Sequence, residues 1–333
     1  MTAGGSRVVQ RAAIDAALAG IDLIKLIEEG FAAYSAGRCN VPPIGELVME
    51  KGEVHIKYGC ITGDSHYVIK IASGFYGNPA LGMASGNGLM LVFSQATGVL
   101  ETILLDEGYL TDVRTAVAGA VAAKYLAPAN VERIGIIGTG VQARLQLEHL
   151  RPVVPCRNVI VYGRTPERRE AFRRDMEAKG YMIETTGEPA AVAASCRLIV
   201  TTTAATAPLL WAGDIRPGTH ISAMGSDTPH KQELDSAILG MASRVVVDSI
   251  PQSRLRGEAA KALGVGAVTE AKIEEIGSLI LGLSSPRAAA DEITVFDATG
   301  VAAQDIQIAK ALAEATRQYI RLEAAGIGSG CRG

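Results

Sequence analysis

The stretch IGIIGTGVQAR, residues 134–144, decides the fold of this chain. Its apolar run up to Ile137 has the pattern of a buried strand, and an amphipathic, helix-like segment follows it. Between the two, Gly138, Gly140 and Ala143 match the spacing G-x-G-x-x-G/A. The first glycine permits a tight turn, the second lets the backbone approach a pyrophosphate, and the alanine permits close helix packing. The stretch therefore predicts a dinucleotide site, with free N–H groups at the helix start that would bind phosphate.

Further short apolar runs follow this unit and alternate with segments of helix length. They lie at residues 158–163, 197–203, 219–225, 244–249 and 293–300. Near-continuous apolar strands separated by helices indicate a parallel sheet that is covered on both faces. We therefore expect an α/β fold in which the middle of the chain forms a Rossmann-type, doubly wound parallel sheet.

The first third of the chain has a different pattern, in which apolar and polar residues alternate. Residues 53–61 and 66–73 are joined by TGDS, and residues 88–94 and 99–105 are joined by QATG. These pairs indicate antiparallel hairpins with glycine-containing turns and predict a separate antiparallel α+β domain. The alanine-rich residues 111–127 favour a helix that links this domain to the parallel sheet. The glycine-rich end, residues 324–333, is expected to be a loose tail.

Composition excludes several classes of function. The 333 residues carry 32 basic and 35 acidic side chains, so nucleic acid is not expected as a partner. The five cysteines form no CxxC pair and the five histidines no HExxH, so neither a disulfide framework nor a metal site is predicted. No apolar leader or run of about 18 apolar residues is present, which favours a cytoplasmic protein without a membrane partner.

The end of the second predicted strand bears on the choice of cofactor. An NAD site usually carries an acidic residue there for the ribose hydroxyls, but this chain has Gly163, Arg164 and Thr165. A guanidinium and a hydroxyl could hold a 2′-phosphate, which favours NADP(H) over NAD(H). The alternative is that Arg164 and Arg168 are solvated charges at the start of a helix.

Two lysines in the first third leave their roles open. Alternation places Lys70 on the strand face opposite Ile69 and Ile71. If that face meets solvent, the lysine is ordinary, and if it meets a cleft, the lysine handles an anion or a proton. The same alternatives hold for Lys57, which shares a face with His55.

Two further charged residues are candidates for the chemistry. With Thr111 as the N-cap of the linking helix, Arg114 would lie in its first turn, where a cation opposes the helix dipole. An anion such as a substrate carboxylate would cancel that penalty, and a pair with Asp112 or Glu107 is the competing interpretation. Asp227 comes just after the apolar run 219–225 and is either a turn former or a working group at the ligand-binding edge of the sheet.

Four motifs in this order and spacing give the chain a family resemblance. They are DVRTAVAGAVAAKYLAP (112–128), IGIIGTGVQAR (134–144), GSDTPHKQEL (225–234) and FDATGVAAQD (296–305). The chain resembles the ornithine cyclodeaminase and mu-crystallin family over roughly residues 10–320. That family includes archaeal-type alanine dehydrogenases and ketimine or other imino-acid reductases.

The resemblance implies a homodimer with two domains in each chain. Residues 1–117 and 305–333 would form the substrate-binding and dimerisation domain, and residues 118–304 the Rossmann domain. Lys70 and Asp227 would be the catalytic residues, and Arg114 would hold the substrate carboxylate. The implied cofactor contacts are Thr115, Gly138, Thr139, Gly140, Val141, Gln142 and Gly300.

One departure from the family pattern concerns the substrate. Many members have an arginine in the early loop as a second clamp on the carboxylate, whereas this chain reads VPPIGELVM over residues 41–49, with Ile44 and Glu46. Either Lys57 or Lys70 replaces the missing cation, or Glu46 faces a basic group on the substrate.

The resemblance and the residues together predict an NAD(P)-dependent oxidoreductase. The expected reaction is hydride transfer at the α-carbon of a small 2-imino or 2-amino acid, as in an imino-acid reductase or L-amino acid dehydrogenase. One alternative is a cyclodeaminase that converts ornithine to proline and ammonia and recycles NAD internally. A further alternative is a non-enzymatic, cofactor-binding protein of the crystallin type.

Overall fold

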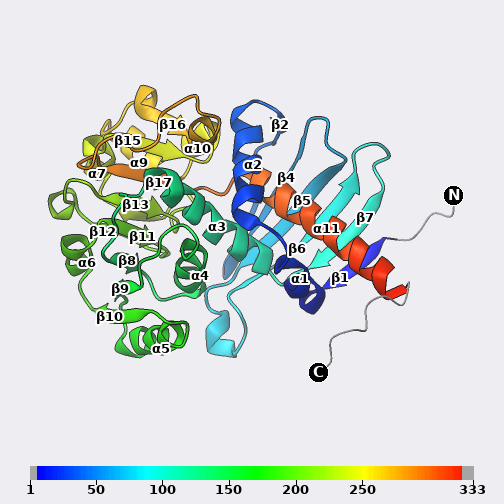
Figure 1. The fold of residues 1–333 in the computed structure, drawn as a ribbon, viewed down its shortest axis with the longest axis horizontal. Coiled ribbons are helices and arrows are strands. Elements are labelled where there is room, and N and C mark those ends of the chain that lie inside the picture. Colours follow the sequence, from blue (N-terminus) through cyan, green and yellow to red (C-terminus); the bar gives the residue numbers. More distant parts are fainter. Residues whose placement is uncertain (1–5, 325–333) are drawn as a thin grey trace. The chain divides into compact units, whose positions relative to one another are not determined.

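The computed structural model describes residues 6–324, with side chains through residue 317, in two compact units. Unit 1 runs from the N-terminus to Arg114 and resumes at Ala302, and unit 2 spans Thr115–Val301. In Figure 1 the blue, cyan and red parts of the chain form unit 1. Helix α3 (Tyr109–Leu126) contains the boundary between the units.

Unit 1 is built on one mixed sheet of seven strands in the order β1-β7-β6-β5-β4-β2, with β3 paired to β4. The strands are β1 (Arg7–Gln10), β2 (Cys39–Asn40), β3 (Gly45–Met49), β4 (Gly52–Ile61), β5 (His66–Gly74), β6 (Gly86–Ser94) and β7 (Leu100–Leu105). Both hairpins expected from the sequence are present and antiparallel, joined by residues 62–65 and 95–99. The first strand makes the sheet mixed, because β1 lies parallel to β7 at its edge.

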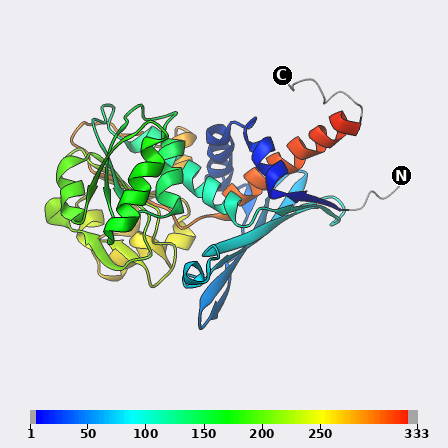
Figure 2. The ribbon, with the colours of Figure 1, turned by 90° about the horizontal axis from the view of Figure 1, so that it is seen from below.

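Helices cover one face of this sheet, as Figure 2 shows. They are α1 (Arg11–Leu18), α2 (Leu23–Ser35) and α11 (Ala302–Ala324), and a short 3-10 turn, η1 (Asn78–Leu81), lies between β5 and β6. Helix α11 packs against β4, β5, β6 and β7. Along β5 to β7 the side chains therefore alternate, since Val68, Met90 and Leu104 are buried while those on the other face stay partly exposed.

Unit 2 contains an all-parallel sheet of eight strands in the order β10-β9-β8-β11-β13-β17-β15-β16. Its strands are β8 (Ile134–Ile137), β9 (Asn158–Tyr162), β10 (Met182–Thr186), β11 (Leu198–Thr201), β13 (His220–Ala223), β15 (Arg244–Val247), β16 (Ile273–Glu275) and β17 (Thr294–Asp297). A separate parallel pair joins β12 (Thr206–Leu210) to β14 (Gln232–Leu234). All six strands expected from apolar runs are present, which confirms the α/β class with a parallel and a mostly antiparallel sheet.

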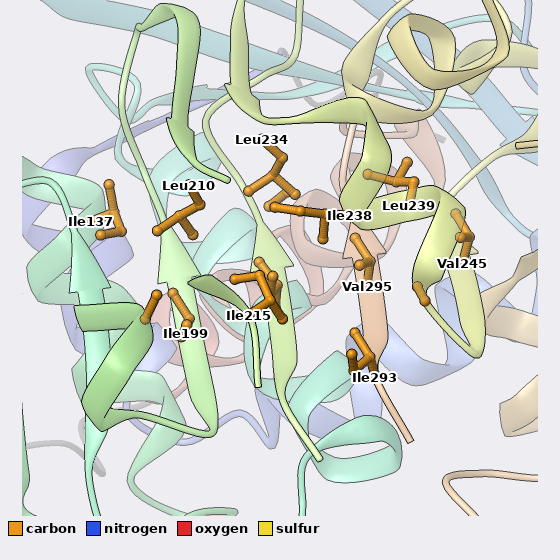
Figure 3. Packing of buried hydrophobic residues seen from close by; sticks show 14 of the residues in the cluster. Ile137, Ile199, Leu210, Ile215, Leu234, Ile238, Leu239, Val245, Ile293 and Val295 are labelled. Atoms are coloured by element: carbon orange, nitrogen blue, oxygen red, sulfur yellow. The ribbon is translucent and has the colours of Figure 1, made fainter. Parts of the chain in front are cut away.

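Helices on the parallel sheet enclose the apolar core of unit 2. They are α4 (Val141–Leu150), α5 (Pro166–Glu177), α6 (Pro189–Ser195), α7 (Ser236–Met241), α8 (Ile250–Ser253), α9 (Gly257–Gly264) and α10 (Ile276–Ile280), with the turns η2 (Ala212–Asp214) and η3 (Glu270–Lys272). Figure 3 shows strand residues such as Ile199 and Val295 beneath Ile238 and Leu239 of α7. This packing fixes the strand ends from which the loops of the site emerge.

The structure contradicts the expected start of the linking helix, and the expected loose tail falls outside the described residues. Helix α3 starts at Tyr109, and its first turn is held by the Asp106 carboxylate, which accepts a hydrogen bond from the Leu110 N–H at 2.8 Å. Thr111 is therefore not the N-cap, and Arg114 lies beyond the first turn, so the helix-dipole argument for its ligand was wrong. The glycine-rich tail, from residue 325 on, lies outside the described residues.

No helix within residues 6–324 is both long enough and apolar enough to cross a membrane.

Candidate active site

The glycine loop of unit 2 has the geometry that a dinucleotide phosphate needs. Gly138 follows β8 with φ at +121°, and a Cβ there would meet Thr202 Oγ1 at 2.6 Å, so only glycine fits. Helix α4 then begins at Val141, and the Gly140 N-cap provides no side-chain hydrogen bond. A Cβ on Gly140 would meet nothing within 4 Å, so the backbone is open to an approaching group. Uncapped N–H groups beside open backbone fit a phosphate.

The end of β9 presents the residues that bear on cofactor choice. Gly163 is tightly placed, because a Cβ there would meet the Thr139 side chain at 2.6 Å. Arg164 and Thr165 are both exposed, and Thr165 precedes α5 without making a side-chain cap. Their guanidinium and hydroxyl groups could hold the hydroxyls or the phosphate of a cofactor ribose.

Asp227 lies in the loop that follows β13, at the carboxyl end of the parallel sheet. Its Oδ1 is 2.6 Å from Lys231 Nζ, and its side chain is 45 % exposed. No helix begins at this loop, because the chain continues into β14 and α7 is capped by Asp235. The Asp227 carboxylate is therefore accessible at this edge of the sheet and does not cap α7.

A buried carboxylate, Glu233, holds the Asp227 loop in place. One oxygen accepts hydrogen bonds from the Thr201 hydroxyl at 2.6 Å and the Gly225 N–H at 3.0 Å. The other accepts from the N–H and the hydroxyl of Thr203. Burial raises the pKa of Glu233, and these hydrogen bonds oppose the rise. Glu233 thereby joins the loops after β11 and β13.

A second buried carboxylate, Asp248, positions the loop after β17, where Gly300 was expected to contact the cofactor. Asp248 Oδ2 accepts hydrogen bonds from the N–H groups of Gly300 at 2.5 Å and Val301 at 3.0 Å, and Oδ1 accepts from Thr299. Gly300 is buried and has φ at +80°. In α3, the carbonyl of Thr115 accepts a hydrogen bond from Gln146 Nε2 of α4 at 3.2 Å. Both backbone positions are fixed by side chains of unit 2.

Unit 1 contains a compact buried cluster of charges. Lys70 of β5 faces α11, and its Nζ lies 3.1 Å from Asp305 Oδ1. The Nε of Arg114 lies 3.0 Å from the same oxygen, and its Nη1 donates to Oε1 of the Gln304 side chain at 3.4 Å. The side chains of Lys70, Arg114 and Asp305 are each at most 6 % exposed. The strand face of Lys70 is thus covered and does not meet solvent, which excludes the first of the two alternatives for this lysine.

Electrostatics give Lys70 a pKa in the physiological range. Its pKa is lowered to about 7, mainly by burial and also by the positive charges of Arg114 and Lys57, while the Asp305 carboxylate opposes the fall. Burial alone would raise the pKa of Asp305, but Lys70 and Arg114 outweigh burial and lower it. A lysine with a pKa near neutral can donate and accept protons at physiological pH.

The other two substrate-binding candidates lie on the strands beside Lys70. Lys57 of β4 is buried and pairs across the strands with Lys70, so both side chains share one face. Glu46 of β3 pairs with His55 instead, and its Oε1 is 3.8 Å from His55 Nδ1. With Glu53, these two form a group whose ligand atoms lie within 4.8 Å of one another and could hold a metal ion. No spacing pattern in the sequence indicated that grouping.

The structure thus brings Lys70, Lys57 and Arg114 together in unit 1, and it places Asp227, Gly300 and the glycine loop in unit 2. Four residues of the site were not singled out from the sequence, namely Glu233, Asp248, Gln304 and Asp305. For the last two a signal was available, because adjacent polar residues interrupt the apolar start of α11, in the sequence VAAQDIQIA. Such residues in a buried helix need partners.

Comparison with known proteins shows similarity along nearly the whole chain. Residues 6–319 match the ornithine cyclodeaminase/mu-crystallin family. A Sinorhizobium fredii protein called an uncharacterized cyclodeaminase is 39 % identical over 294 residues, which are 87 % of this chain and 89 % of that protein.

Two solved structures share the fold. An archaeal alanine dehydrogenase dimer with bound NAD superposes with a TM-score of 0.87 at 32 % identity, covering 95 % of this chain and 97 % of the other. The Δ1-pyrroline-2-carboxylate reductase of Thermococcus litoralis, in complex with NADH and L-proline, superposes with a TM-score of 0.89 at 27 % identity. That match covers 94 % of this chain and 98 % of the other.

Proposed function

Because the chain belongs to the ornithine cyclodeaminase/mu-crystallin family, we propose that it is an NAD(P)H-dependent imino-acid reductase that also oxidises the corresponding L-amino acid. The observation that carries this proposal is the buried pair of cations, Lys70 and Arg114, of which Lys70 has a pKa of about 7. A fixed guanidinium suits a carboxylate, and a lysine of near-neutral pKa suits proton transfer. A 2-imino acid has both features, because its carboxylate is attached to the carbon whose C=N nitrogen must gain a proton.

Unit 2 would bind the cofactor. In this proposal the first-turn N–H groups of α4 and the glycine loop hold the pyrophosphate, and Thr115 and Gly300 contribute further contacts. The bound nicotinamide supplies the hydride for the α-carbon of the imine, or accepts it from the amino acid.

The chain's own residues then orient the substrate and move the proton. Arg114 grips the substrate carboxylate, and Lys57 adds a second positive charge in place of the arginine that many family members have. Lys70 and Asp227 exchange the proton at the substrate nitrogen. Fixing the carboxylate restricts which face and which atom of the imine can react. Glu46 would contact a basic side chain of the substrate, if the substrate has one.

The preference for NADP(H) remains a proposal that rests on Arg164 and Thr165 alone. Both side chains are exposed after β9, where a 2′-phosphate would be recognised, but the two solved relatives described above hold NAD or NADH. Comparing the KM for NADPH and NADH in the wild type and in Arg164→Gln tests the preference. We expect the variant to lose affinity for NADPH only; an equal loss for both would assign Arg164 no part in the choice.

A cyclodeaminase is the second candidate, because the similar protein of Sinorhizobium fredii carries that name. Such an enzyme would oxidise ornithine, let the side-chain amine attack the imine carbon, release ammonia and return the hydride to give proline. The two candidates differ in an observable way, since the cyclodeaminase shows no net change of cofactor.

The deciding experiment follows the absorbance of reduced nicotinamide with purified protein. NADPH or NADH is supplied with 2-oxo acids plus ammonia or methylamine and with cyclic imino acids, and ornithine is tested with NAD. We expect net oxidation of cofactor with at least one imine. Proline and ammonia from ornithine without net oxidation would identify the cyclodeaminase instead, and inactivity in every assay would favour a binding protein.

A pair of variants links that activity to the cluster. Lys70→Met should abolish imine reduction, because it removes the proton-transferring amine. Lys310→Met is the matched control, since Lys310 lies on α11 and is paired with Asp64 outside the cluster. We expect the control to keep wild-type turnover; equal losses in the two variants would contradict the role of Lys70.

We further propose that the protein is a cytoplasmic homodimer that uses the partly exposed face of the unit 1 sheet.

A further inference from the structure

Asp305 touches both Lys70 and Arg114, the cations of the buried cluster, through one oxygen, Oδ1. We propose that Asp305 is a positioning residue whose carboxylate holds the Lys70 ammonium and the Arg114 guanidinium in the orientation in which they meet the substrate. The inference rests on the proposed function, which assigns the substrate carboxylate to Arg114 and a proton to Lys70.

The three side chains come from three separate elements. Lys70 extends from β5, Arg114 from α3 and Asp305 from α11, and all three are almost completely buried. Lys70 Nζ and Arg114 Nε lie 3.1 and 3.0 Å from Asp305 Oδ1. Because both cations lie so close to one oxygen atom, they are also close to each other, and two buried positive charges repel strongly. Without the shared carboxylate, neither side chain would keep its position.

The bonding of Asp305 differs from that of the carboxylates that hold the fold together. Both oxygens of Asp248 accept backbone N–H groups, and both oxygens of Glu233 accept hydrogen bonds from loop residues. Among the described residues, Asp305 Oδ2 is buried and accepts no hydrogen bond. The recorded partners of Asp305 are therefore the two cations of the cluster, and its carboxylate supports no loop.

The charges around Lys70 show what the removal of Asp305 would do. Lys57 of β4 and Arg114 of α3 disfavour its ammonium form, whereas Asp305 of α11 favours it. Asp106, before α3, is the other carboxylate that interacts with Lys70. When Asp305 is neutral, two cations and one anion remain around the amine. The Lys70 amine would then lose its proton at a lower pH.

A purely structural role is the competing interpretation, because Asp305 lies in the first turn of α11, where an acidic residue stabilises the helix. The two roles differ in what they predict for Asp305→Asn, which keeps the shape and removes the charge. A structural role lowers stability and leaves the pH dependence of the reaction unchanged. A positioning role changes the pH profile and the KM for the imine together.

The test compares the wild type with Asp305→Asn, using the most active imine of the panel and NADH or NADPH. In the variant we expect the alkaline limb of the kcat/KM profile to move to lower pH. We also expect the KM for the imine to rise about tenfold, because the neutral amide no longer holds the Arg114 guanidinium in place. The KM for the nucleotide should not change. Asp64→Asn is the matched control, because it breaks the carboxylate–lysine pair with Lys310 on the same helix.

A readout without turnover separates this inference from the proposed function. Carbon-13 NMR of labelled lysine, with the Lys70 signal assigned from Lys70→Met, follows the titration of Lys70 directly. We expect Lys70 to titrate at lower pH in Asp305→Asn than in the wild type and in Asp64→Asn. An unchanged titration would overturn the inference even in an active enzyme, whereas a shifted titration in a protein that reduces no imine would overturn only the proposed function.

If Asp305→Asn does not fold, Asp305→Glu replaces it in the same assays. The charge is retained but displaced by one methylene, so Lys70 should titrate near its wild-type pH while the KM for the imine still rises. A wild-type KM in Asp305→Glu would show that the position of this carboxylate does not matter, and the inference would fail.

Discussion

At the scale of single residues, Asp227 and Lys70, the two groups proposed to transfer protons, lie in very different surroundings. Lys70 is buried among fixed charges, and its pKa is set by burial and by Arg114, Lys57 and Asp305. The Asp227 side chain is 45 % exposed, and its partner Lys231 lies four residues further along the chain. Burial holds a group in one geometry, whereas exposure lets a group exchange protons with water. A reaction that must deliver a proton and then restore it uses both.

For Asp227→Asn we expect turnover to fall by about a hundredfold or more, within the range for the loss of a general acid or base. Cofactor affinity should stay the same, because the amide keeps the shape of the side chain. Steady-state kinetics and nucleotide binding by calorimetry measure the two effects. Asp235→Asn is the control, since Asp235 caps α7 in the same segment and should affect stability only. Normal turnover in Asp227→Asn would remove Asp227 from the mechanism.

At the scale of elements, the strands with apolar sequences could be predicted and those at the edges could not. Strands such as β8 and β11 are buried on both faces, and they read IGII and LIVT. The edge strands β10 and β16 read MIETT and IEE, which lack that signal because one side of each is not covered by another strand. The Lys70–Asp305 pair was equally hidden, since its partners are 235 residues apart and no local pattern joins them.

The turn between β8 and α4 is the element on which cofactor binding should depend most. Gly138→Ala forces a side chain into a left-handed conformation and against Thr202, so we expect about 1–3 kcal/mol of lost stability together with lost nucleotide affinity. Gly180→Ala is the control, because Gly180 has φ at +84° but its Cβ would meet nothing within 4 Å. Thermal unfolding and nucleotide titration compare the two. If both variants bound nucleotide normally, the loop would not be the cofactor site.

The buried acids next to β17 make the stability of unit 2 depend on pH. Burial and the neighbouring Asp297 raise the pKa of Glu258 to about 8, and burial raises that of Asp297 to about 7. Between their ordinary values, 4.5 and 3.8, and these raised values, the folded chain binds more protons than the unfolded chain. The free energy of unfolding therefore falls as pH rises through that window.

Glu258→Gln tests this contribution, because it removes the Glu258 carboxyl group and keeps the Asp297 carboxyl group. The variant loses part of the hydrogen bonding that Glu258 provides to the N–H groups of Glu233 and Leu234, so it should be less stable at low pH. Its melting temperature should fall less steeply between about pH 5 and 8 than that of the wild type. Calorimetry over this range measures both slopes. Parallel curves would show that Glu258 titrates normally.

At the scale of the whole molecule, the sheet of unit 1 has one covered face and one face that needs a partner. Tyr58, Ile69, Leu91 and Ile103 lie opposite one another on β4 to β7, facing away from α11. Their side chains are partly exposed although they are apolar. A contiguous apolar face of this kind marks an interaction site. In the homodimer proposed above, a second copy of the chain would cover this face.

Leu91→Lys places a charge in the centre of that face, and we expect it to convert the dimer to a monomer, since an unpaired charge is costly to bury in an interface. Sedimentation velocity or light scattering measures the mass of the variant and of the wild type. Met182→Lys is the control, because Met182 is exposed and apolar but lies on the edge strand β10 of unit 2. A monomeric wild type would refute the dimer, and a Leu91→Lys variant that stays dimeric would place the interface elsewhere. If the monomeric variant also loses turnover while Met182→Lys does not, activity requires the assembled sheet face as well as the buried cluster behind it.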